Sequence, residues 1–490
     1  MSRLCARHGA RRMALGRSHP GEPGIGDTLG PPFVAGDEPT RWLFSLNRFG
    51  IRPGLSRVQG LLADMGHPER NLRTIVTAGT NGKGSTTRIL ARLLQDAGHR
   101  VVSYTSPHLL NVHERIEIND TPVDPLDFAA RVEAIRPLTE KHEASWFETL
   151  TAIAVKIASD EGADYFCCET GLGGRLDATN ALPSIANLLT TVSLDHQKIL
   201  GSSLPEIAAE KLGLLKRDVP LFTGVDDELR SQTFMAAVTA GSQCFFLDEL
   251  ARWPNSEGQT WDLTLRKTIH QDLPDFGTVA MQRNVALAVL ALTELSASRG
   301  ESMLPDDPSA SLRNLFLPGR YHRVFRDPDW IFDTAHNAQA LIHVLSTFLA
   351  ATKDKPSGRN IVIYGAMEDK GTPAELAPLF DQCDHLVGVP VTLPRSCTPD
   401  ELRSRFVELG QAPGAPPDLW KNRCTVFDEL SLALQAVATG ATIDDRVLVT
   451  GSCFMVAETL HKLGIEKLSD AREVRPASSA LAQIQIRSEG

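Results

Sequence analysis

The sequence predicts an α/β protein built on doubly wound, largely parallel sheets. Short apolar runs suited to buried strands alternate with segments whose apolar residues recur at helical spacing, and this alternation is typical of parallel sheets covered by helices on both faces. One strand–helix junction is a glycine-rich turn, VTAGTNGKGS at residues 76–85. The chain has 490 residues, which is too long for one hydrophobic core, so we expect two domains.

The glycine-rich turn is the most informative stretch. It follows an apolar strand and precedes a helical pattern, so its backbone N–H groups lie at the positive end of a helix dipole, where phosphate oxygens fit. Lys83 adds a cation and Ser85 a hydroxyl for Mg²⁺. The spacing departs from the usual P-loop, because Gly84 separates the lysine from the hydroxyl residue. We predict phosphate binding here.

The first domain is expected to span residues 38–310. Its predicted strands are the apolar runs at 72–79, 100–105, 163–169, 185–192 and 219–224. Helical patterns occur at 147–162 and 204–216, and a strong helix follows at 281–297. The stretch between 225 and 280 is less regular, which favours some antiparallel strand.

A second α/β series is expected over residues 311–466. A segment rich in Pro, Asp and Ser, residues 298–314, marks the approach to this boundary. The predicted strands, each followed by a helical pattern, are 329–335, 359–366, 384–390, 424–427 and 445–451. Residues 467–490 have the composition of a polar tail.

The N-terminal residues 1–37 differ from the rest. Five arginines precede the first acidic residue, Glu22, as in a transit peptide, which leaves mitochondrial import as an alternative. The segment has little apolar periodicity, however. We therefore favour a disordered extension, or an over-long start with Met13 as the alternative first residue.

Composition excludes several partners. The net charge of −10 argues against nucleic acid, and no apolar run is long enough to span a membrane. Eight cysteines without C-x-x-C or zinc spacing indicate free thiols in a reducing compartment. We expect a cytoplasmic monomer whose partners are small molecules.

The loop GTNGKGS resembles the ATP loop of the Mur ligase superfamily, and within it that of the dihydrofolate synthase/folylpolyglutamate synthase family. Further blocks agree in the family's order, among them YTSPHLLNVHERIEIN, WFETLTA, ETGLGGRLDATN, SLDH, AEKLG, PGR, DTAHNA and VTGSCF. The resemblance covers roughly residues 40 to 465. It implies a P-loop (Mur-ligase-type) central ATPase domain, a C-terminal Rossmann-like α/β domain and an active site in the cleft between them.

The resemblance also implies a reaction. ATP phosphorylates a carboxylate, and the α-amine of glutamate attacks the acyl phosphate to form an amide. The acceptor is dihydropteroate, a folate, or both, and the sequence leaves this open. Two alternatives stay open as well: another amino-acid ligase of the Mur family, and a nucleotide-binding regulator without catalysis.

We expect ATP and Mg²⁺ as cofactors, with two metal sites. Glu148 stands at a helix start between aromatic neighbours; it could be a simple helix-start carboxylate, but the resemblance favours a metal ligand. By the same resemblance, the other candidate ligands are Ser85, Ser106, His196 and Lys211.

Lys211 lies in a mostly apolar helix beside Glu210. A solvated helix lysine is the simple alternative, but in the family the corresponding lysine is carbamylated by CO₂, which turns a cation into a metal-binding carboxylate. Carbamylation needs a neutral amine, hence a pKa lowered by burial. The predicted catalytic residues are Lys83, Lys211 and His196.

The predicted nucleotide contacts come from both domains. They are Asn81, Gly82, Lys83, Gly84, Ser85, Asn284, Arg320, Asp333 and His336. Ala338 stands where the family usually has proline, so the loop that carries His336 is expected to be less rigid.

The acceptor side is predicted from shorter segments. SPHLLNVHERI is expected to cover the pteroate, and residues 40–71 have the spacing of two short helices beside a pterin pocket. Arg115 could equally be a surface-strand arginine. The candidate substrate contacts are Arg57, Ser106, Pro107, His108, Arg115 and Phe128.

Overall fold

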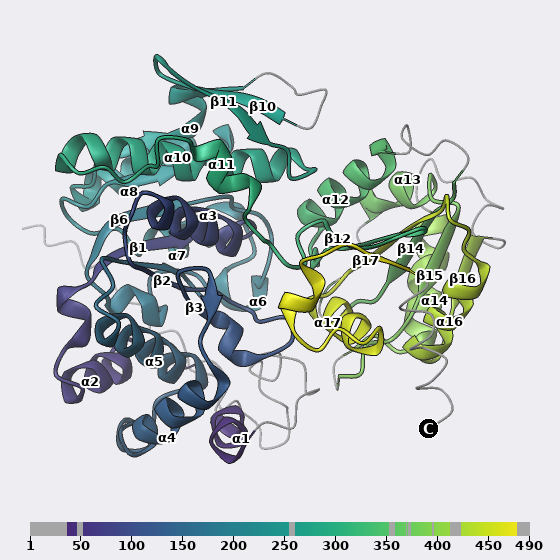
Figure 1. Cartoon of the computed structure of the whole chain (residues 1–490), viewed down its shortest axis with the longest axis horizontal. Coiled ribbons are helices and arrows are strands. Elements are labelled where there is room, and N and C mark those ends of the chain that lie inside the picture. The colour runs from purple at the N-terminus through teal and green to yellow at the C-terminus, as the bar shows by residue number, and fades with distance from the viewer. Residues whose placement is uncertain are drawn as a thin grey trace, which may run out of the picture.

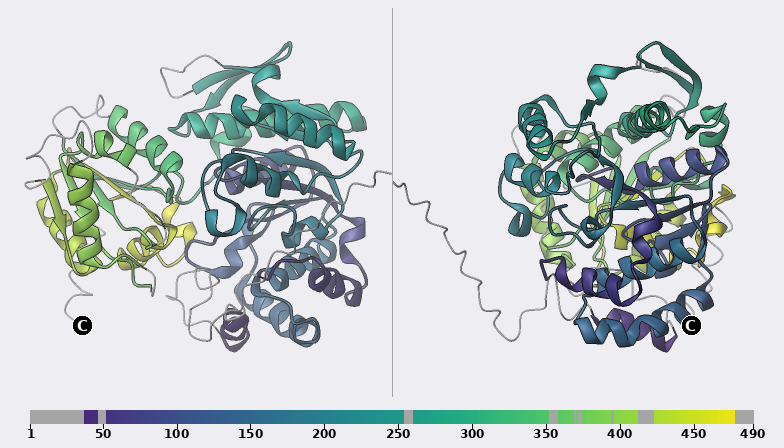
Figure 2. Two further views of the ribbon diagram at one scale, coloured as in Figure 1. Left: turned by 180° about the vertical axis from the view of Figure 1, so that it is seen from behind. Right: turned by 90° about the vertical axis from the view of Figure 1, so that its left-hand side faces the viewer.

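The computed structural model describes residues 37–46, 52–253, 260–351, 358–368, 370, 374–393, 396–411 and 423–477. Two α/β domains lie side by side, each with its own sheet (Figures 1 and 2). The N-terminal extension predicted for residues 1–37 lies outside the described residues apart from Asp37, and so does the predicted tail after residue 477.

The first domain is built on an eight-stranded sheet in the order β4-β3-β2-β5-β1-β6-β7-β8. All five predicted strands are present, and they pair in parallel. An antiparallel edge, β3 and β4, was not predicted. The bounds are β1 Arg73–Ala78, β2 Val101–Tyr104, β3 Ile116–Ile118, β4 Thr121–Pro122, β5 Tyr165–Glu169, β6 Ser184–Leu189, β7 Leu221–Thr223 and β8 Cys244–Phe246.

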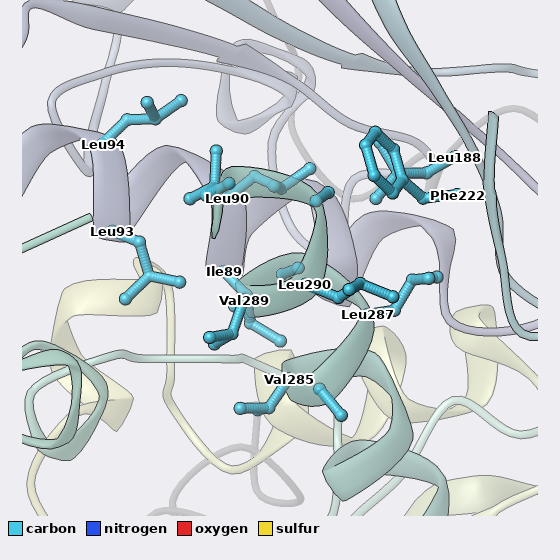
Figure 3. Packing of buried hydrophobic residues seen from close by; sticks show 14 of the residues in the cluster. Ile89, Leu90, Leu93, Leu94, Leu188, Phe222, Val285, Leu287, Val289 and Leu290 are labelled. Atoms are coloured by element: carbon cyan, nitrogen blue, oxygen red, sulfur yellow. The ribbon is translucent and has the colours of Figure 1, made fainter. Parts of the chain in front are cut away.

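Helices cover both faces of this sheet because successive strand residues point to opposite sides. Ile75 of β1 joins a core with α3 (Lys83–Asp96) and α10 (Val279–Arg299), as Figure 3 shows for the two helices. Its neighbour Val76 joins the opposite core with α2 (Ser56–Asp64) and α5 (Trp146–Asp160). The remaining helices are α1 Glu38–Ser45, α4 Pro125–His142, α6 Gln197–Leu200, α7 Leu204–Leu212, α8 Asp227–Ala240, α9 Leu247–Leu250 and α11 Pro308–Arg313.

The irregular stretch after residue 225 contains the expected antiparallel strands. They form a separate three-stranded sheet, which lies beyond α10 at the edge of the domain (Figure 1). Its members are β9 Ala251–Arg252, β10 Thr260–Leu265 and β11 Thr268–Pro274.

The second domain has a seven-stranded sheet in the order β16-β15-β14-β17-β13-β12-β18. The five predicted strands again pair in parallel. The strands are β12 His322–Arg326, β13 Asp329–Phe332, β14 Asn360–Tyr364, β15 His385–Gly388, β16 Cys424–Val426, β17 Arg446–Thr450 and β18 Arg475–Pro476. The helices are α12 Ala338–Ala350, α13 Ala377–Phe380, α14 Pro399–Gly410, α16 Leu430–Gly440 and α17 Cys453–Lys462.

The polar tail predicted from residue 467 is wrong for residues 467–477. Leu468, Ala471 and Ala477 are buried in the second domain's core. β18 pairs in parallel with β12, so this segment adds an edge strand. Three small or aliphatic residues among polar ones are enough to anchor it. Within the described residues, no helix has the length and apolar character needed to cross a membrane.

Candidate active site between the two domains

The candidate site forms where central parallel strands of the first sheet end. The glycine-rich turn follows β1, Ser106 follows β2, Glu169 ends β5 and His196 follows β6. Because β2, β5, β1 and β6 are neighbours, these residues meet at one edge of the sheet, where α/β proteins bind ligands. They line a cavity of about 930 Å³ whose other wall is the second domain.

The glycine loop needs its glycines. Gly82 caps α3 in a left-handed conformation with φ of 85°, and a Cβ there would lie 2.5 Å from the side-chain oxygen of Asn284. A Cβ on Gly79 would lie 1.9 Å from the hydroxyl of Thr190. The loop therefore packs closely against its surroundings, and its backbone reaches the cavity without side chains in the way.

Lys83 and Lys211 both donate to backbone carbonyls of this loop. Lys83 Nζ lies 3.2 Å from the Thr80 oxygen, and Lys211 Nζ lies 2.7 Å from the Gly79 oxygen. Lys211 is 4% exposed. Burial, together with the nearby charge of Lys83, lowers the pKa of Lys211 to about 7. The alternative of a solvated helix lysine is therefore wrong.

His196 stands beside a polar contact between the domains. Asp195 accepts from Lys370 and from Asn337 Nδ2 at 3.3 Å, and His336 Nε2 lies 3.7 Å from it. Although burial acts in the opposite direction, these cationic and donor groups hold the pKa of Asp195 well below its usual range. Burial lowers the pKa of His196 to about 4 even though Asp195 acts to raise it, so its imidazole is neutral at pH 7.

Glu148, the predicted metal ligand, is held by other groups. Its two oxygens lie 3.0 and 3.1 Å from the guanidinium of Arg57, and Ser145 N donates to it at 2.7 Å. It lines the cavity, but it serves as the N-terminal carboxylate of α5 in a capping box. The structure thus joins two residues that the sequence assigned to separate roles.

Glu169 was not singled out from the sequence, although it stands in the matched block ETGLGG. It is 1% exposed, and one oxygen accepts from Ser106 N. The other has no hydrogen-bond partner among the residues that the structure describes, and a Cβ on Gly84 would lie 3.2 Å from it. Burial raises the pKa of Glu169, and Lys83 acts to lower it. The available signal was an acidic residue ending the strand beside β1.

The second domain contributes Arg320, Asp333 and His336 to the cavity lining. Asp333 accepts from Tyr321 N at 2.7 Å and Ala335 N at 2.8 Å. Burial raises its pKa, and Arg320 acts to lower it.

The loop before α12 also reaches the glycine loop. Asn337 caps α12 by accepting from Ala340 N at 3.0 Å, so the helix begins in order without the proline that Ala338 replaces. The amide of Asn81 donates to Gln339 at 2.9 Å and to Asn337 at 3.2 Å. Asn81 therefore links the domains, while buried Asn284 lines the cavity beside Gly82.

The acceptor-side prediction is corrected in two places. Arg115 is 1% exposed, with its guanidinium 4.5 Å from the Trp146 ring centre and its Nε donating to His108 Nδ1 at 2.9 Å. It lines the cavity, so the surface-strand alternative is wrong. Phe128 instead packs inside the core between α4 and α5 and does not line the cavity, because it lies on the inner face of α4.

The remaining acceptor-side residues fall around this cluster. Burial and the charge of Arg115 hold the pKa of His108 well below its usual value, so it can accept that hydrogen bond. Pro107 lines the cavity, whereas Arg57 is turned to Glu148. In the described part of the chain, no group of three His, Cys, Asp or Glu side chains could hold a metal ion.

The chain is similar to known ligases throughout most of its length. Residues 319–453 match the model of the Mur ligase glutamate ligase domain. The dihydrofolate synthase/folylpolyglutamate synthase of Bacillus subtilis is 30% identical over 358 residues, which is 69% of this chain and 81% of that protein.

Solved structures agree with this. The structure of the Escherichia coli enzyme in complex with DHPP and ADP matches this chain with a TM-score of 0.74 and 27% identity. The match covers 87% of this chain and 97% of that one. A bifunctional folylpolyglutamate synthase/dihydrofolate synthase with Mn, AMPPNP and L-glutamate bound has a TM-score of 0.75 at 27% identity, covering 87% of this chain and 98% of that one.

A phosphate-type glycine loop on one α/β domain, facing basic and acidic groups of a second α/β domain across a shared cavity, defines an ATP-dependent ligase of the Mur type. The 30% sequence identity to the Bacillus subtilis protein, over 69% of this chain and 81% of that protein, identifies the family within this class. The chain belongs to the dihydrofolate synthase/folylpolyglutamate synthase family.

Proposed function

We propose that this protein uses ATP and a divalent metal to join L-glutamate to dihydropteroate, to folates, or to both. The carrying observation is the placement of the glycine loop, with Lys83, opposite Arg320 and Asp333 in one cavity. Similar proteins are solved with ADP, AMPPNP, Mn and L-glutamate bound. The cavity also offers an apolar side at Trp146 and Phe147 that suits a flat acceptor ring.

The nucleotide is proposed to bind across both domains. Its phosphates would accept from the backbone at residues 81–85 and from Lys83, with Arg320 reaching them from the second domain. Asn284 is placed to read the base, and Asp333 to bind ribose hydroxyls. We infer that Asn81 and His336 hold the glycine loop and the loop before α12 together around the nucleotide. The Asn81 amide donates to Gln339 of the second domain, and His336 Nε2 lies 3.7 Å from Asp195 of the first domain.

We propose two metal sites. Glu169, with its unpartnered oxygen, would join the hydroxyls of Ser85 and Ser106 as hard oxygen ligands that Mg²⁺ prefers. His196 would hold the second site with Lys211 as a carbamate. Bound metal would offset the charge of the transferring phosphate. Glu148 is the weaker candidate because Arg57 already neutralises it.

Carbamylation of Lys211 is supported by its surroundings. Only a neutral amine attacks CO₂, and burial brings the pKa of Lys211 to about 7. The nitrogen would form a bond to the carbon of CO₂ and release a proton, leaving an anionic carboxylate in place of a cation.

The chemistry then needs positioning more than acid–base catalysis. An acceptor carboxylate oxygen attacks the γ-phosphorus, and ADP departs. The glutamate amine attacks the resulting acyl phosphate, phosphate departs, and the amine loses a proton. Enclosure between the domains keeps water from the acyl phosphate.

The test supplies purified protein with ATP, Mg²⁺ and L-glutamate. Dihydropteroate, tetrahydrofolate and a UDP-linked muropeptide are offered separately, and ADP release and product mass are measured. We expect a glutamyl product with one or both pterin acceptors. Product from the muropeptide alone would replace this proposal with another Mur-type ligase, and nucleotide binding without any product would favour a regulator.

We further propose a monomer that acts in the cytoplasm. Sedimentation of the purified protein, with and without nucleotide, tests the monomer.

A further inference from the structure

The segment between β2 and β3 crosses from the first domain to the second. Leu109 and Leu110 are 7% and 5% exposed, yet both belong to the hydrophobic core of the second domain, together with residues of β12, α16 and α17. A Cβ on Gly319, at the start of the second domain, would lie 3.6 Å from Leu109 Cδ2. The side chains of these two first-domain leucines are thus packed inside the second domain.

A buried carboxylate shapes this segment. Glu114 is 4% exposed. Its Oε2 accepts from the backbone N–H groups of Leu109 and Leu110, both at 3.1 Å, and its Oε1 accepts from Asn111 N at 2.9 Å. Three backbone donors on one carboxylate fix the turn, so its two leucines are held in place as a unit.

The same segment carries groups of the candidate site at both ends. Ser106 donates to Glu169 at one end, while Arg115 at the other end stacks on Trp146 and donates to His108. Two polar contacts also join this part of the first domain to the second domain. Asn111 donates to the Glu466 carbonyl at 3.4 Å, and Arg472 pairs with Asp120 at 3.3 Å.

We propose that Leu109 and Leu110 are positioning residues that, through their packing in the second domain, set the acceptor-side wall of the cavity, which Arg115 and Trp146 line and where His108 accepts from Arg115. This rests on the proposed function, in which that wall faces the acceptor. Gly79 and Gly82 of the glycine loop pack against Thr190 and Asn284 of the first domain rather than against the leucines. Truncating the leucines should therefore weaken acceptor use and spare nucleotide binding.

The test compares Leu109→Ala and Leu110→Ala with Leu434→Ala. Leu434 is fully buried in the same second-domain core, on α16, so its truncation removes the same atoms from that core at a position outside the segment. Measurements are Tm, the Kd of a fluorescent ADP analogue, and KM for the acceptor that the wild type uses. We expect all three to lower Tm, but only the segment variants to raise acceptor KM, about tenfold or more, with the nucleotide Kd within about twofold.

Rescue and failure are separable. Leu110→Met keeps the volume and should restore a near-normal acceptor KM, and Glu114→Ala should reproduce the leucine effect. If the alanine variants do not fold, Leu110→Val and Leu434→Val give the same comparison. An acceptor KM within threefold of wild type, or an equal rise in Leu434→Ala, overturns the inference. Absence of wild-type turnover with any pterin acceptor overturns the proposed function instead.

Discussion

Lys83 and Lys211 serve one loop from different surroundings. Lys83 starts α3 at the cavity edge, whereas Lys211 approaches from the buried side of α7. Each donates to a carbonyl of the same loop. A lysine held in a dry site, such as Lys211, becomes available for chemistry that needs a neutral amine, whereas Lys83 at the cavity edge is placed to reach a bound ligand.

Lys83→Ala should lower ADP formation at least about 10²-fold with saturating ATP, because it removes a preorganised charge from the phosphate site. The fold should be kept, since Lys83 is only partly buried and donates to one carbonyl. Rate and thermal unfolding are measured together. A rate within threefold of wild type would show that the loop has been wrongly assigned.

Lys211→Ala should also lose activity, and acetate should restore part of it by supplying the missing carboxylate. Wild-type protein in ¹³C-bicarbonate should give a carbamate carbon signal that the variant lacks. Lys83→Ala is the control. If acetate restored the activity of this variant equally, the rescue of Lys211→Ala would not support a carbamate. A crystal structure with nucleotide and metal that shows an unmodified ammonium would contradict the carbamate.

Glu169→Gln should weaken Mn²⁺ binding in the presence of nucleotide by about tenfold or more, as followed by the electron paramagnetic resonance of free Mn²⁺. Glu148→Gln should change it little and lower Tm instead, because the loss falls on the pair with Arg57 and on the helix cap. The reverse pattern would return the metal role to Glu148.

The sequence predicted those site residues whose placement depends only on neighbouring residues in the chain. The glycine loop was predictable because glycine, lysine and helix follow one another in the chain. Glu169 and the burial of Arg115 were not, because they depend on Trp146, His108 and Ser106, which the fold brings together from separate segments. Phe128 was assigned by position alone, and the helix turns it inward.

At the level of elements, apolar runs identified the parallel strands because those strands are buried on both faces. The short strands at and near the sheet edges were not predicted. β3, β4 and β18 have three residues or fewer with mixed polarity, which is too short for an apolar run to mark them. The C-terminal segment was therefore taken as a tail, although its few apolar residues enter the core.

His322 should make the docking of that C-terminal segment sensitive to acid. Its Nε2 lies 2.9 Å from the Ala471 carbonyl, and burial lowers its pKa to about 4 despite this bond. An unfolded histidine titrates near 6.5, so between about pH 6.5 and 4 the unfolded state binds a proton that the folded state does not. Stability contributed at neutral pH is therefore lost as the pH falls through this window.

The measurement compares Tm against pH for wild type and His322→Gln. Glutamine keeps a donor for the carbonyl but does not titrate, so its Tm should fall less between pH 6.5 and 4.5. Equal slopes in the two proteins would show that His322 does not contribute to the acid sensitivity.

On the scale of the whole molecule, two domains line one cavity. Asn81 and Asp195 of the first domain contact Asn337 and Lys370 of the second, close to the proposed phosphate site. A nucleotide bound there should slow amide hydrogen exchange in both domains, at residues 79–85 and at 333–340. Arg320→Ala should keep the first effect and reduce the second. Protection confined to the first domain would contradict binding across the cleft.

The insertion of Leu109 and Leu110 also bears on how the chain is made. Domains generally fold in order as a chain leaves the ribosome, and the core that covers these two side chains comes from residues 324 to 477. The first domain therefore emerges with its phosphate loop complete but with two leucines still uncovered. At that stage Arg320 and Asp333 of the second domain have not yet been added, so the cavity still lacks its second wall. The second domain, once folded, both covers the two leucines and supplies the other wall of the cavity.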